Sequence, residues 1–364
     1  MKVKEVLGAL ERFAPLPLQD GFDNAGLQIG LTEAEATGAL LCLDVTEEVV
    51  DEAVALGVNL IVAHHPLLFA GCKSITGKDE VERCVLKAIK HDVAVYAAHT
   101  NLDNAQGGVN FRMARQLGLQ DVRVLRPLEG KLLKLVTFVP TDHAEALRAA
   151  LFQAGCGNIG AYDCCSYNIQ GVGTFRPGEH TNPYCGVHGS LHEEAETRIE
   201  TILPAYLRRR VLAALLKAHP YEEPAYDFYT LAQDWPQVGS GIIGTLPKAM
   251  PESEFLQQVK QKFQVACLRH NGPVGRSIER VALCGGSGAF LIPDAIAAGA
   301  DAFLTGEIGY HKFFGRKQEI LLMEAGHYET EQYTKELLQE ILERSCPDLK
   351  IYLTRINTNP IKYL

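Results

Sequence analysis

Histidines stand directly after three short, mainly apolar segments of this chain. The segments are residues 59–63, 93–98 and 320–326, and the histidines that follow them are His64 and His65, His99, and His327. Each segment is typical of a buried strand, and a helix-like stretch follows each one. Because ligands bind at the carboxyl ends of the strands in an open α/β sheet, we expect these histidines to meet at one sheet edge.

Two acidic residues accompany these histidines. Asp103 follows His99 by four residues, and Glu331 follows His327 by four residues. If a helix begins at Tyr328, His327 and Glu331 lie about one turn apart on one face and can bind the same ion. Ionisable groups left unpaired beneath apolar surroundings would be costly, and a bound cation removes that cost. The combination therefore predicts a metal site.

Each element alone also has a simpler interpretation. The pair His64 and His65 could be one buried and one exposed histidine, and the segment 99–103 could be a strand end with an Asx-turn. The acids after His327 could simply favour a helix N-terminus. Taken together, imidazole and carboxylate groups without thiolate favour Zn, Mn, Fe or Co over Mg or Ca. The cluster offers more ligands than one tetrahedral ion uses, so two ions bridged by a carboxylate fit better, with Glu331 as the candidate bridge.

Other residues at the same expected edge could assist this chemistry. Asp44 follows the strand-like residues 40–43, and Glu307 follows a Thr-Gly pair. Either could orient a histidine or act as the general base for a metal-activated water, and the simpler alternative is an N-cap or a solvated turn. The glycine-rich residues 285–288 could cradle an anion or form a tight turn. Four further candidate ligands have a spacing that fits no zinc pattern, so we expect a polar loop there: His180, Cys185, His188 and His192.

The chain is long enough for more than one domain, and its order of strand-like and helix-like segments changes twice. It has 364 residues, of which 47% are hydrophobic and 22% are charged, as in globular proteins. Residues 1–127 and 239–364 alternate strand-like and helix-like segments, which predicts an α/β host domain with a mainly parallel sheet. Residues 128–238 follow a βαββαβ order, which predicts an inserted α+β ferredoxin-like domain. The expected fold is therefore a split host interrupted by this insert.

Composition limits the classes of partner. A formal net charge of −9 argues against a broad nucleic-acid surface. No apolar stretch approaches the roughly 20 residues that span a bilayer, and the start of the chain lacks a secretory signal. The ten cysteines are spread thinly, with only Cys164 and Cys165 adjacent, which is typical of reduced thiols. We expect a cytoplasmic protein with no membrane partner.

Several of these segments, in this order, resemble the NIF-three-like family, whose members are widely described as GTP cyclohydrolase I type two homologues. The segments are residues 23–30 (DNAGLQIG), 64–66 (HHP), 99–103 (HTNLD), 285–288 (GGSG), 305–307 (TGE) and 326–331 (GHYETE). The middle of the chain, including residues 219–224 (HPYEEP), resembles the PII/CutA-like insert of longer bacterial members. The resemblance implies a toroidal homohexamer whose metal sites face an inner cavity. It also implies a dinuclear metal site, bridged by Glu331, with the ligands His64, His65, Asp103, His327 and Glu331.

The leading functional hypothesis is a hydrolase that uses two divalent transition-metal ions per chain (Zn, or Fe or Mn). Its substrate would be a small molecule such as a nucleotide. In a GTP cyclohydrolase-type reaction a metal-activated water would open the purine ring, Glu307 or Asp44 would move protons, and residues 285–288 would hold phosphate. The alternative is a non-catalytic, ring-shaped metal-binding scaffold or regulator whose insert senses a ligand. DNA binding through the central hole of a ring is disfavoured by the acidic balance.

Overall fold

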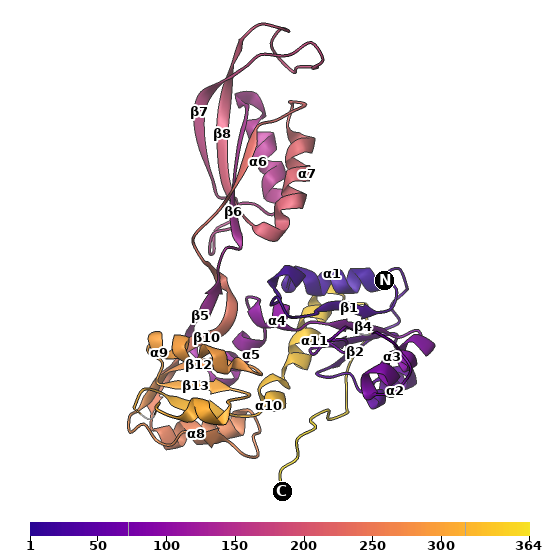
Figure 1. Cartoon of the computed structure of the whole chain (residues 1–364), viewed down its shortest axis with the longest axis vertical. Helices are drawn as coiled ribbons and strands as arrows, with labels where there is room; N and C mark the ends of the chain where they lie inside the picture. The colour runs from indigo at the N-terminus through magenta and orange to yellow at the C-terminus, as the bar shows by residue number, and fades with distance from the viewer. Residues whose placement is uncertain (72, 317) are drawn as a thin grey trace. The chain divides into compact units, whose positions relative to one another are not determined.

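The computed structural model describes residues 1–71, 73–316 and 318–364 (Figure 1). The chain divides into two compact units. The first, called here the host unit, combines Met1–Pro127 with Pro236–Leu364, and the second, called the inserted unit, is Leu128–Trp235. Among the described helices, none is both long enough and apolar enough to cross a membrane.

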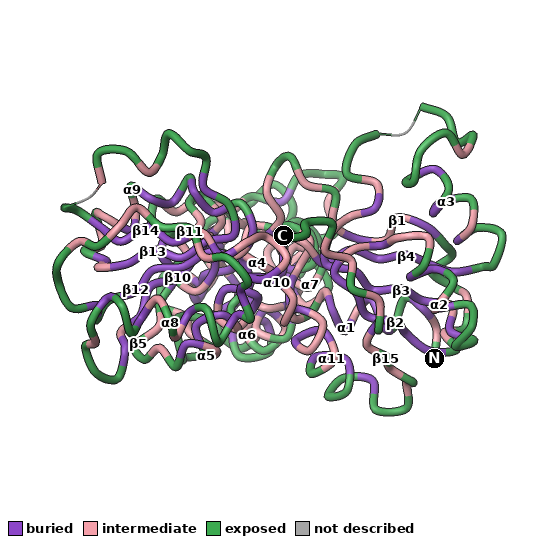
Figure 2. The backbone as a smooth tube through the Cα atoms, turned by 90° about the horizontal axis from the view of Figure 1, so that it is seen from below, coloured by how far each residue is buried: buried purple, intermediate pink, exposed green. Residues whose placement is uncertain are grey.

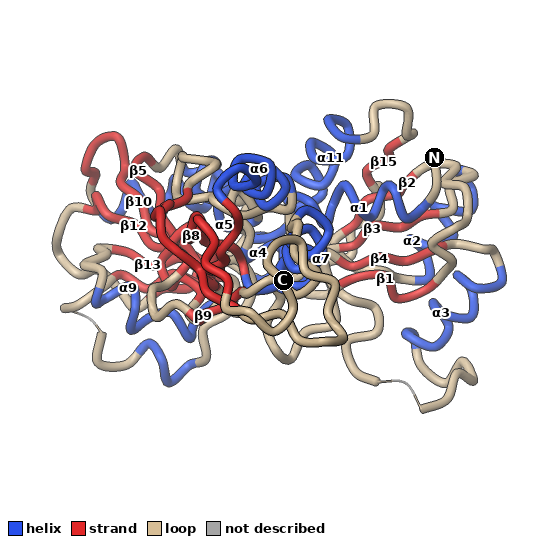
Figure 3. Tube along the Cα trace, turned by 90° about the horizontal axis from the view of Figure 1, so that it is seen from above, coloured by secondary structure: helices blue, strands red, loops and turns tan. Residues whose placement is uncertain are grey.

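One sheet of the host unit has the strand order β1-β4-β3-β2-β15. Its strands are β1 (Gly26–Ile29), β2 (Ala39–Cys42), β3 (Leu60–Ala63), β4 (Ala94–Ala97) and β15 (Ile351–Leu353). β15, β2, β3 and β4 pair in parallel, and β1 runs antiparallel to β4. Figure 3 shows β2, β3 and β4 side by side, and the side chains of all three are fully buried (Figure 2). Strands buried on both faces explain why these segments are continuously apolar.

Helices cover both faces of this first sheet. The core on one face packs residues of α2 and α3 against β2, β3 and β4. On the other face, α11 contacts β2, β15 and α1, so the C-terminal part of the chain completes the N-terminal sheet (Figure 1). The helices are α1 (Val3–Phe13), α2 (Glu47–Leu56), α3 (Glu80–Lys90) and α11 (Thr334–Ser345).

A second sheet of the host unit has the order β11-β14-β13-β12-β10-β5. Its strands are β5 (Gln120–Leu128), β10 (Trp235–Met250), β11 (Arg269–His270), β12 (Ile278–Cys284), β13 (Ala302–Thr305) and β14 (Leu321–Glu324). β12, β13 and β14 are parallel, whereas β10 and β11 are antiparallel to their neighbours. Separate hydrophobic cores lie on the two faces, one with α5 and α8 and the other with α9. These helices are α5 (Val109–Leu117), α8 (Glu252–Lys262) and α9 (Ile292–Ala297).

The presence of two sheets corrects the expectation of a single sheet edge. The histidines of the first half follow β3 and β4, whereas His327 follows β14 of the other sheet. Apolar runs identify the strands but do not say which strands share hydrogen bonds, so the sequence alone left this undecided. After β14 the chain forms two helices, α10 (His327–Glu331) and α11.

The inserted unit has the element order β6-α6-β7-β8-α7-β9, with an antiparallel sheet ordered β7-β8-β6-β9. This is the βαββαβ plan. α6 and α7 cover one face, where they form a core with β6 and β8 (Figure 1). The elements are β6 (Leu132–Pro140), α6 (Ala144–Gln153), β7 (Ser166–Phe175), β8 (His192–Pro204), α7 (Arg208–Ala218) and β9 (Tyr226–Thr230).

Candidate metal centre

His64 and His65 extend β3 by two residues before Pro66 ends the run. Their amides donate to the carbonyls of Cys42 and Leu43 at 3.2 and 2.9 Å, which holds both residues in the sheet ladder. The ring of His64 is completely buried, and its Nδ1 lies 2.7 Å from the carbonyl oxygen of Ala98. A carbonyl only accepts, so Nδ1 carries the proton and Nε2 presents its lone pair to the site.

The ring of His65 is fixed in the same way by a carboxylate. Its Nδ1 lies 2.7 Å from Oδ1 of Asp44, while Oδ2 of Asp44 accepts a 2.6 Å hydrogen bond from Thr358. Nε2 of His65 lies 3.0 Å from Oε2 of Glu331. Burial disfavours the imidazolium, but Asp44 and Glu331 outweigh burial and raise the pKa of His65 to about 10.

Asp103 enters from the short helix α4 (Thr100–Asn104), directly after β4. Its Oδ1 is buried and lies 3.7 Å from Nε2 of His64. Burial and the nearby charge of Glu331 raise the pKa of Asp103 to about 8. A carboxylate buried beside another negative charge is costly, and either a proton or a bound cation removes that cost.

His327 and Glu331 come from the second sheet, at the two ends of the one-turn helix α10. Gly326 precedes the helix with a φ of 98°, a conformation that favours glycine. Nε2 of His327 lies 3.2 Å from Oε2 of Glu331 and 3.3 Å from Nε2 of His65. Burial lowers the pKa of His327, but Glu331 and then Glu307 outweigh it and raise the pKa to about 9.

Glu307 supports His327 as Asp44 supports His65. Its Oε1 lies 2.9 Å from Nδ1 of His327, and its Oε2 accepts a hydrogen bond from Ser287. Ser287, followed by His327, lowers the pKa of Glu307. Burial alone would raise the pKa of Asp44, but the hydrogen bonds from His65 and Thr358 lower it. Both acids therefore stay ionised at neutral pH and orient imidazoles, which is the first of the two roles considered for them.

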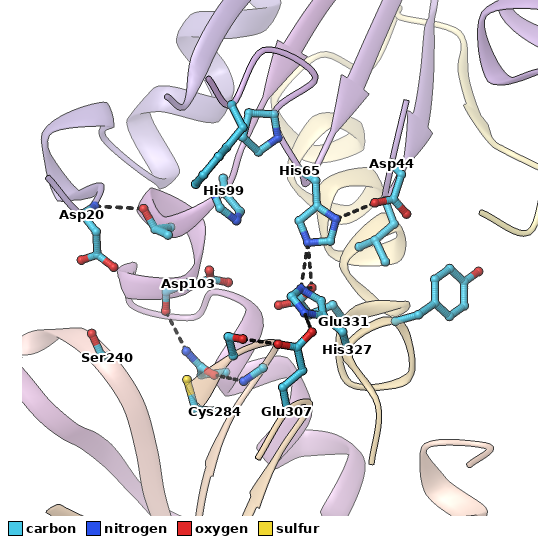
Figure 4. Close-up of a pocket in the computed structure, with 18 of the residues that line it drawn as sticks. Asp20, Asp44, His65, His99, Asp103, Ser240, Cys284, Glu307, His327 and Glu331 are labelled. Atoms are coloured by element: carbon cyan, nitrogen blue, oxygen red, sulfur yellow. Dashed lines mark hydrogen bonds and ion pairs between the residues drawn. The ribbon is translucent and has the colours of Figure 1, made fainter. Parts of the chain in front are cut away.

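The two oxygens of Glu331 face different sets of ligand atoms. Figure 4 shows Glu331 beside His327 and below His65. Oε1 lies 3.7 Å from His64 Nε2, and Oε2 lies close to the Nε2 atoms of His65 and His327. The ligand atoms of His64, Asp103 and Glu331 lie within 4.8 Å of one another, as do those of His65, His327 and Glu331. Each set matches the spacing of ligands around one ion, and a shared carboxylate is the usual bridge between two.

Unsatisfied polar atoms test whether a cation fits here. Among the buried side-chain atoms that the structure describes, Nε2 of His64 and Oδ1 of Asp103 have no hydrogen-bond partner. Their 3.7 Å separation is too long for a hydrogen bond between them but suits two ligands of one ion. Buried polar groups are normally satisfied, so this pair fits a site built for a metal.

The cluster opens into a cavity of about 580 Å³ in the host unit, which is within the usual size of small-molecule sites. Aromatic side chains of Phe22, Phe69 and Phe290 line it together with the histidines and acids. No lysine or arginine is among the described residues of the lining. The pocket therefore offers rings for stacking but no lysine or arginine for a phosphate.

The turn at residues 285–288 does not form the expected anion cradle. Its amides already donate to side chains of the protein: Gly285 to Asn110 at 2.9 Å, Gly286 to Thr330 at 3.1 Å and Gly288 to Thr305 at 2.9 Å. An anion would have to displace these bonds, which favours the tight-turn alternative. The turn instead makes room for the side chain of Glu331, because a Cβ on Gly286 would overlap its Oε1.

The sequence analysis placed His99 among the histidines of the site but did not identify its partner, Asp23. Nδ1 of His99 lies 2.7 Å from Oδ1 of Asp23, and His99 has a nitrogen within 4.8 Å of nitrogens of His64 and His65. The position of His99 after a strand was a usable signal. Nothing in spacing linked it to Asp23, which lies 76 residues away.

Comparisons with known proteins agree over the whole chain. The sequence model of the Duf34/NIF3 (NGG1p interacting factor 3) family matches residues 1–360. A protein of Halalkalibacterium halodurans named GTP cyclohydrolase 1 type 2 homolog is 41% identical over 364 residues, covering 99% of this chain and 98% of that protein. The Bacillus subtilis protein of the same name is 38% identical over 367 residues, covering 99% and 98%. The crystal structure of a Bacillus cereus protein related to NIF3 is 39% identical and matches with a TM-score of 0.87, covering 100% of this chain and 99% of that chain. The chain therefore belongs to the Duf34/NIF3 family.

Proposed function

We propose that this centre binds two divalent transition-metal ions, zinc or else iron or manganese, and that the protein is a metal-dependent hydrolase. The observation that carries the proposal is the position of Glu331, whose two carboxylate oxygens face separate ligand sets. His64 and Asp103 would share one ion with Glu331, and His65 and His327 would share the other. When bound, such ions supply Lewis acidity and make a water molecule acidic enough to act as a nucleophile near neutral pH.

The remaining residues of the site prepare its ligands. Asp44 and Glu307 accept the Nδ1 protons of His65 and His327, which leaves each Nε2 lone pair directed at the centre. We assign the two acids this positioning role rather than that of a general base, because the oxygens bonded to the imidazoles and to Thr358 and Ser287 are already occupied.

For the substrate, we propose a small heterocycle, with GTP cyclohydrolase-type opening of a purine ring as the specific candidate. The name of the related proteins supports this choice, and the phenylalanine side chains of the pocket can stack on a planar base. Because the described lining has no lysine or arginine, we propose that side-chain recognition centres on the base. A screen should therefore compare nucleobases and nucleosides with nucleotides.

The first experiment is elemental analysis of the purified protein beside a His65→Ala, Glu331→Gln double variant. The proposal predicts about two transition-metal ions per chain, lost in the variant. The loaded protein is then assayed for hydrolysis of the screened heterocycles. A protein that takes up no metal after reconstitution, or that turns over substrate equally well without it, would contradict the proposal.

A second candidate function is a non-catalytic, metal-binding regulator with a ligand-sensing insert of the PII/CutA-like type. The inserted unit supports it, because it has a cavity of its own of about 540 Å³. Metal uptake without turnover, together with saturable binding of a small molecule that protects the insert from proteolysis, would favour this candidate over the hydrolase.

We also propose that the protein assembles as a toroidal homohexamer. Exposed apolar residues at the mouth of the host-unit cavity support a contact with another copy, since Phe22 is 67% and Phe69 53% exposed. Light scattering measures the mass directly: six chains per particle would support the ring, and a monomer at working concentration would contradict it.

A further inference from the structure

The inserted unit brings together a second set of metal-binding side chains. Cys185 lies in the connection 176–191 between β7 and β8, and His192 and Glu194 begin β8. Their ligand atoms lie within 4.8 Å of one another, and Nε2 of His192 lies 2.8 Å from Oε2 of Glu194. These residues belong to a different unit from the cluster around Glu331.

Strand geometry explains why two of these ligands meet. Successive side chains of a strand alternate between its faces, so His192 and Glu194, two residues apart, point to the same face of β8. That face is opposite to the one covered by α6 and α7, because Ile199 and Leu203, at odd positions, belong to the core with those helices. The pair is therefore accessible from the uncovered side of the sheet, with about 28% of each side chain exposed.

The loop that carries Cys185 rests directly on His192. Gly186 has a φ of 86°, and a Cβ at that position would lie 3.1 Å from Cβ and Cγ of His192. Only a glycine lets the backbone approach the ring this closely, so the local sequence places the thiol next to the imidazole. Another candidate ligand of this region, His188, has a different partner: its Nε2 lies 2.9 Å from the carbonyl oxygen of Thr181.

The thiol also has a polar partner on its outer side. Sγ of Cys185 lies 3.8 Å from the hydroxyl of Tyr221, and this hydroxyl donates a 2.8 Å hydrogen bond to Oε1 of Glu196. Glu196 is two residues beyond Glu194 on the same face of β8. If the Tyr221 hydroxyl turns towards Sγ, it can donate to the thiolate form of Cys185, and an outer hydrogen bond of this kind is how proteins hold metal ligands in position.

We propose that Cys185, His192 and Glu194 form a second metal site, which binds one zinc-like divalent ion. Thiolate, imidazole and carboxylate together suit Zn²⁺, and three protein ligands leave the fourth tetrahedral position to water or a ligand. Binding replaces the hydrogen bond between His192 and Glu194 with two metal–ligand bonds. The imidazole stays neutral, with its proton on Nδ1 instead of Nε2, and the thiol proton of Cys185 is released to solvent. The thiolate and the carboxylate balance the two charges of the ion.

The ion would also fix one wall of the cavity in the inserted unit. Tyr184, next to Cys185, lines that cavity together with Tyr221 and Glu196. The two tyrosine rings lie 6.1 Å apart, and Nε2 of His143 lies 2.9 Å from the hydroxyl of Tyr184. A bond from the ion to Cys185 ties the loop to β8, so the metal orders the wall that Tyr184 provides.

Cobalt(II) is the probe that separates this site from the one in the host unit. A thiolate bound to Co²⁺ gives an intense charge-transfer band in the near ultraviolet, whereas the proposed ligands of the host site contain no thiolate. Full-length protein is titrated with Co²⁺ alone, beside three variants. Cys185→Ser removes the thiolate, Cys164→Ser removes an exposed thiol of the same unit as the control, and His65→Ala with Glu331→Gln disables the host site.

The proposal predicts a band that disappears in Cys185→Ser and persists in the other two variants. In the variant whose host site is disabled, the band should saturate at one Co²⁺ per chain. A band that is absent from the unmodified protein, or that survives in Cys185→Ser, overturns it. A second measurement needs no variant: Zn²⁺ should slow alkylation of Cys185 in the native protein by about tenfold or more, because only the free thiolate reacts. Peptide mapping identifies the residue, and an unchanged rate at Cys185 overturns the proposal whatever the variants show.

Discussion

Asp44 accepts the Nδ1 proton of His65 at 2.7 Å, and the opposite nitrogen of the same ring lies 3.0 Å from Glu331. One imidazole thus connects an orienting carboxylate of the first sheet to the carboxylate that joins both ligand sets. Glu307 and His327 repeat the arrangement from the second sheet, with a 2.9 Å contact. Each half of the host unit therefore contributes an acid that orients a histidine, and both histidines face Glu331.

Replacing Asp44 by Asn should weaken metal binding without removing a ligand. The amide cannot hold the Nδ1 proton of His65 as a carboxylate does, so the ring loses its fixed orientation and basicity, and affinity should fall by about 10- to 100-fold. Competition with a chromophoric chelator measures this. Asp51→Asn, on the exposed surface of α2, is the matched control, and equal affinities for the two variants would refute the positioning role.

Metal affinity should rise as the pH rises from 7 to 9. In the metal-free site the raised pKa values of His65, His327 and Asp103, about 10, 9 and 8, mean that these groups hold protons at pH 7. A metal ion must displace those protons, so binding releases them and becomes easier as they are lost to solvent. Calorimetry in buffers of different ionisation enthalpy counts the protons. Binding that is independent of both buffer and pH would contradict the predicted site.

Gly286→Ala should damage the centre through its shape. The φ of 56° is unfavourable for alanine by about 1–2 kcal/mol, and the new Cβ would overlap Oε1 of Glu331. We expect lower thermal stability and weaker metal binding together. Gly309→Ala is the control, since a Cβ there meets nothing within 4 Å and its φ is −60°. If both variants bound metal as the unmodified protein does, Gly286 would not be needed to leave room for Glu331.

Asp23→Asn should destabilise the host unit in a pH-dependent way. Burial would raise the pKa of Asp23, but hydrogen bonds from His99 and Thr100 outweigh it and lower the pKa to about 2. A folded-state pKa below the unfolded value of about 3.9 gives stability that is present above that value and is lost as the pH falls towards 2. We expect a loss of about 1–3 kcal/mol at neutral pH that shrinks in acid. Denaturant unfolding of both proteins across this range tests it, and a difference that stays constant with pH would argue against the carboxylate's role.

Most of the chemistry and many local elements follow from the residue pattern alone. Continuous apolar runs predicted β2, β3, β4 and β14, because strands buried on both faces are built almost entirely from apolar residues. The residues after those strands identified the ligand candidates, since the ends of buried strands are where polar side chains can converge. The spacing of His327 and Glu331 on one helical turn matches α10.

The sequence pattern did not predict β10, because its glycines allow a close approach to a neighbouring strand and do not form an apolar run. β10 contains Gly239, Gly241, Gly244 and Pro247, which are typical of turns. In the structure a Cβ on Gly239 would overlap the carbonyl oxygen of Arg126 in β5, and one on Gly244 would lie 2.8 Å from the carbonyl oxygen of Gln120. Such glycines reflect a neighbour in space that local patterns do not reveal.

The assembly of the site depends on how distant segments of the chain pack. This packing places ligands from two sheets around Glu331, supplies Asp23 as the partner of His99, and pairs the amides of Gly285, Gly286 and Gly288 with side chains rather than an anion. It also brought Cys185 to His192 through a glycine contact that no spacing rule describes. The physical reason is the same in each case. Local sequence fixes the backbone preference and the chemistry of each side chain, whereas contacts between distant segments depend on how whole sheets and loops pack.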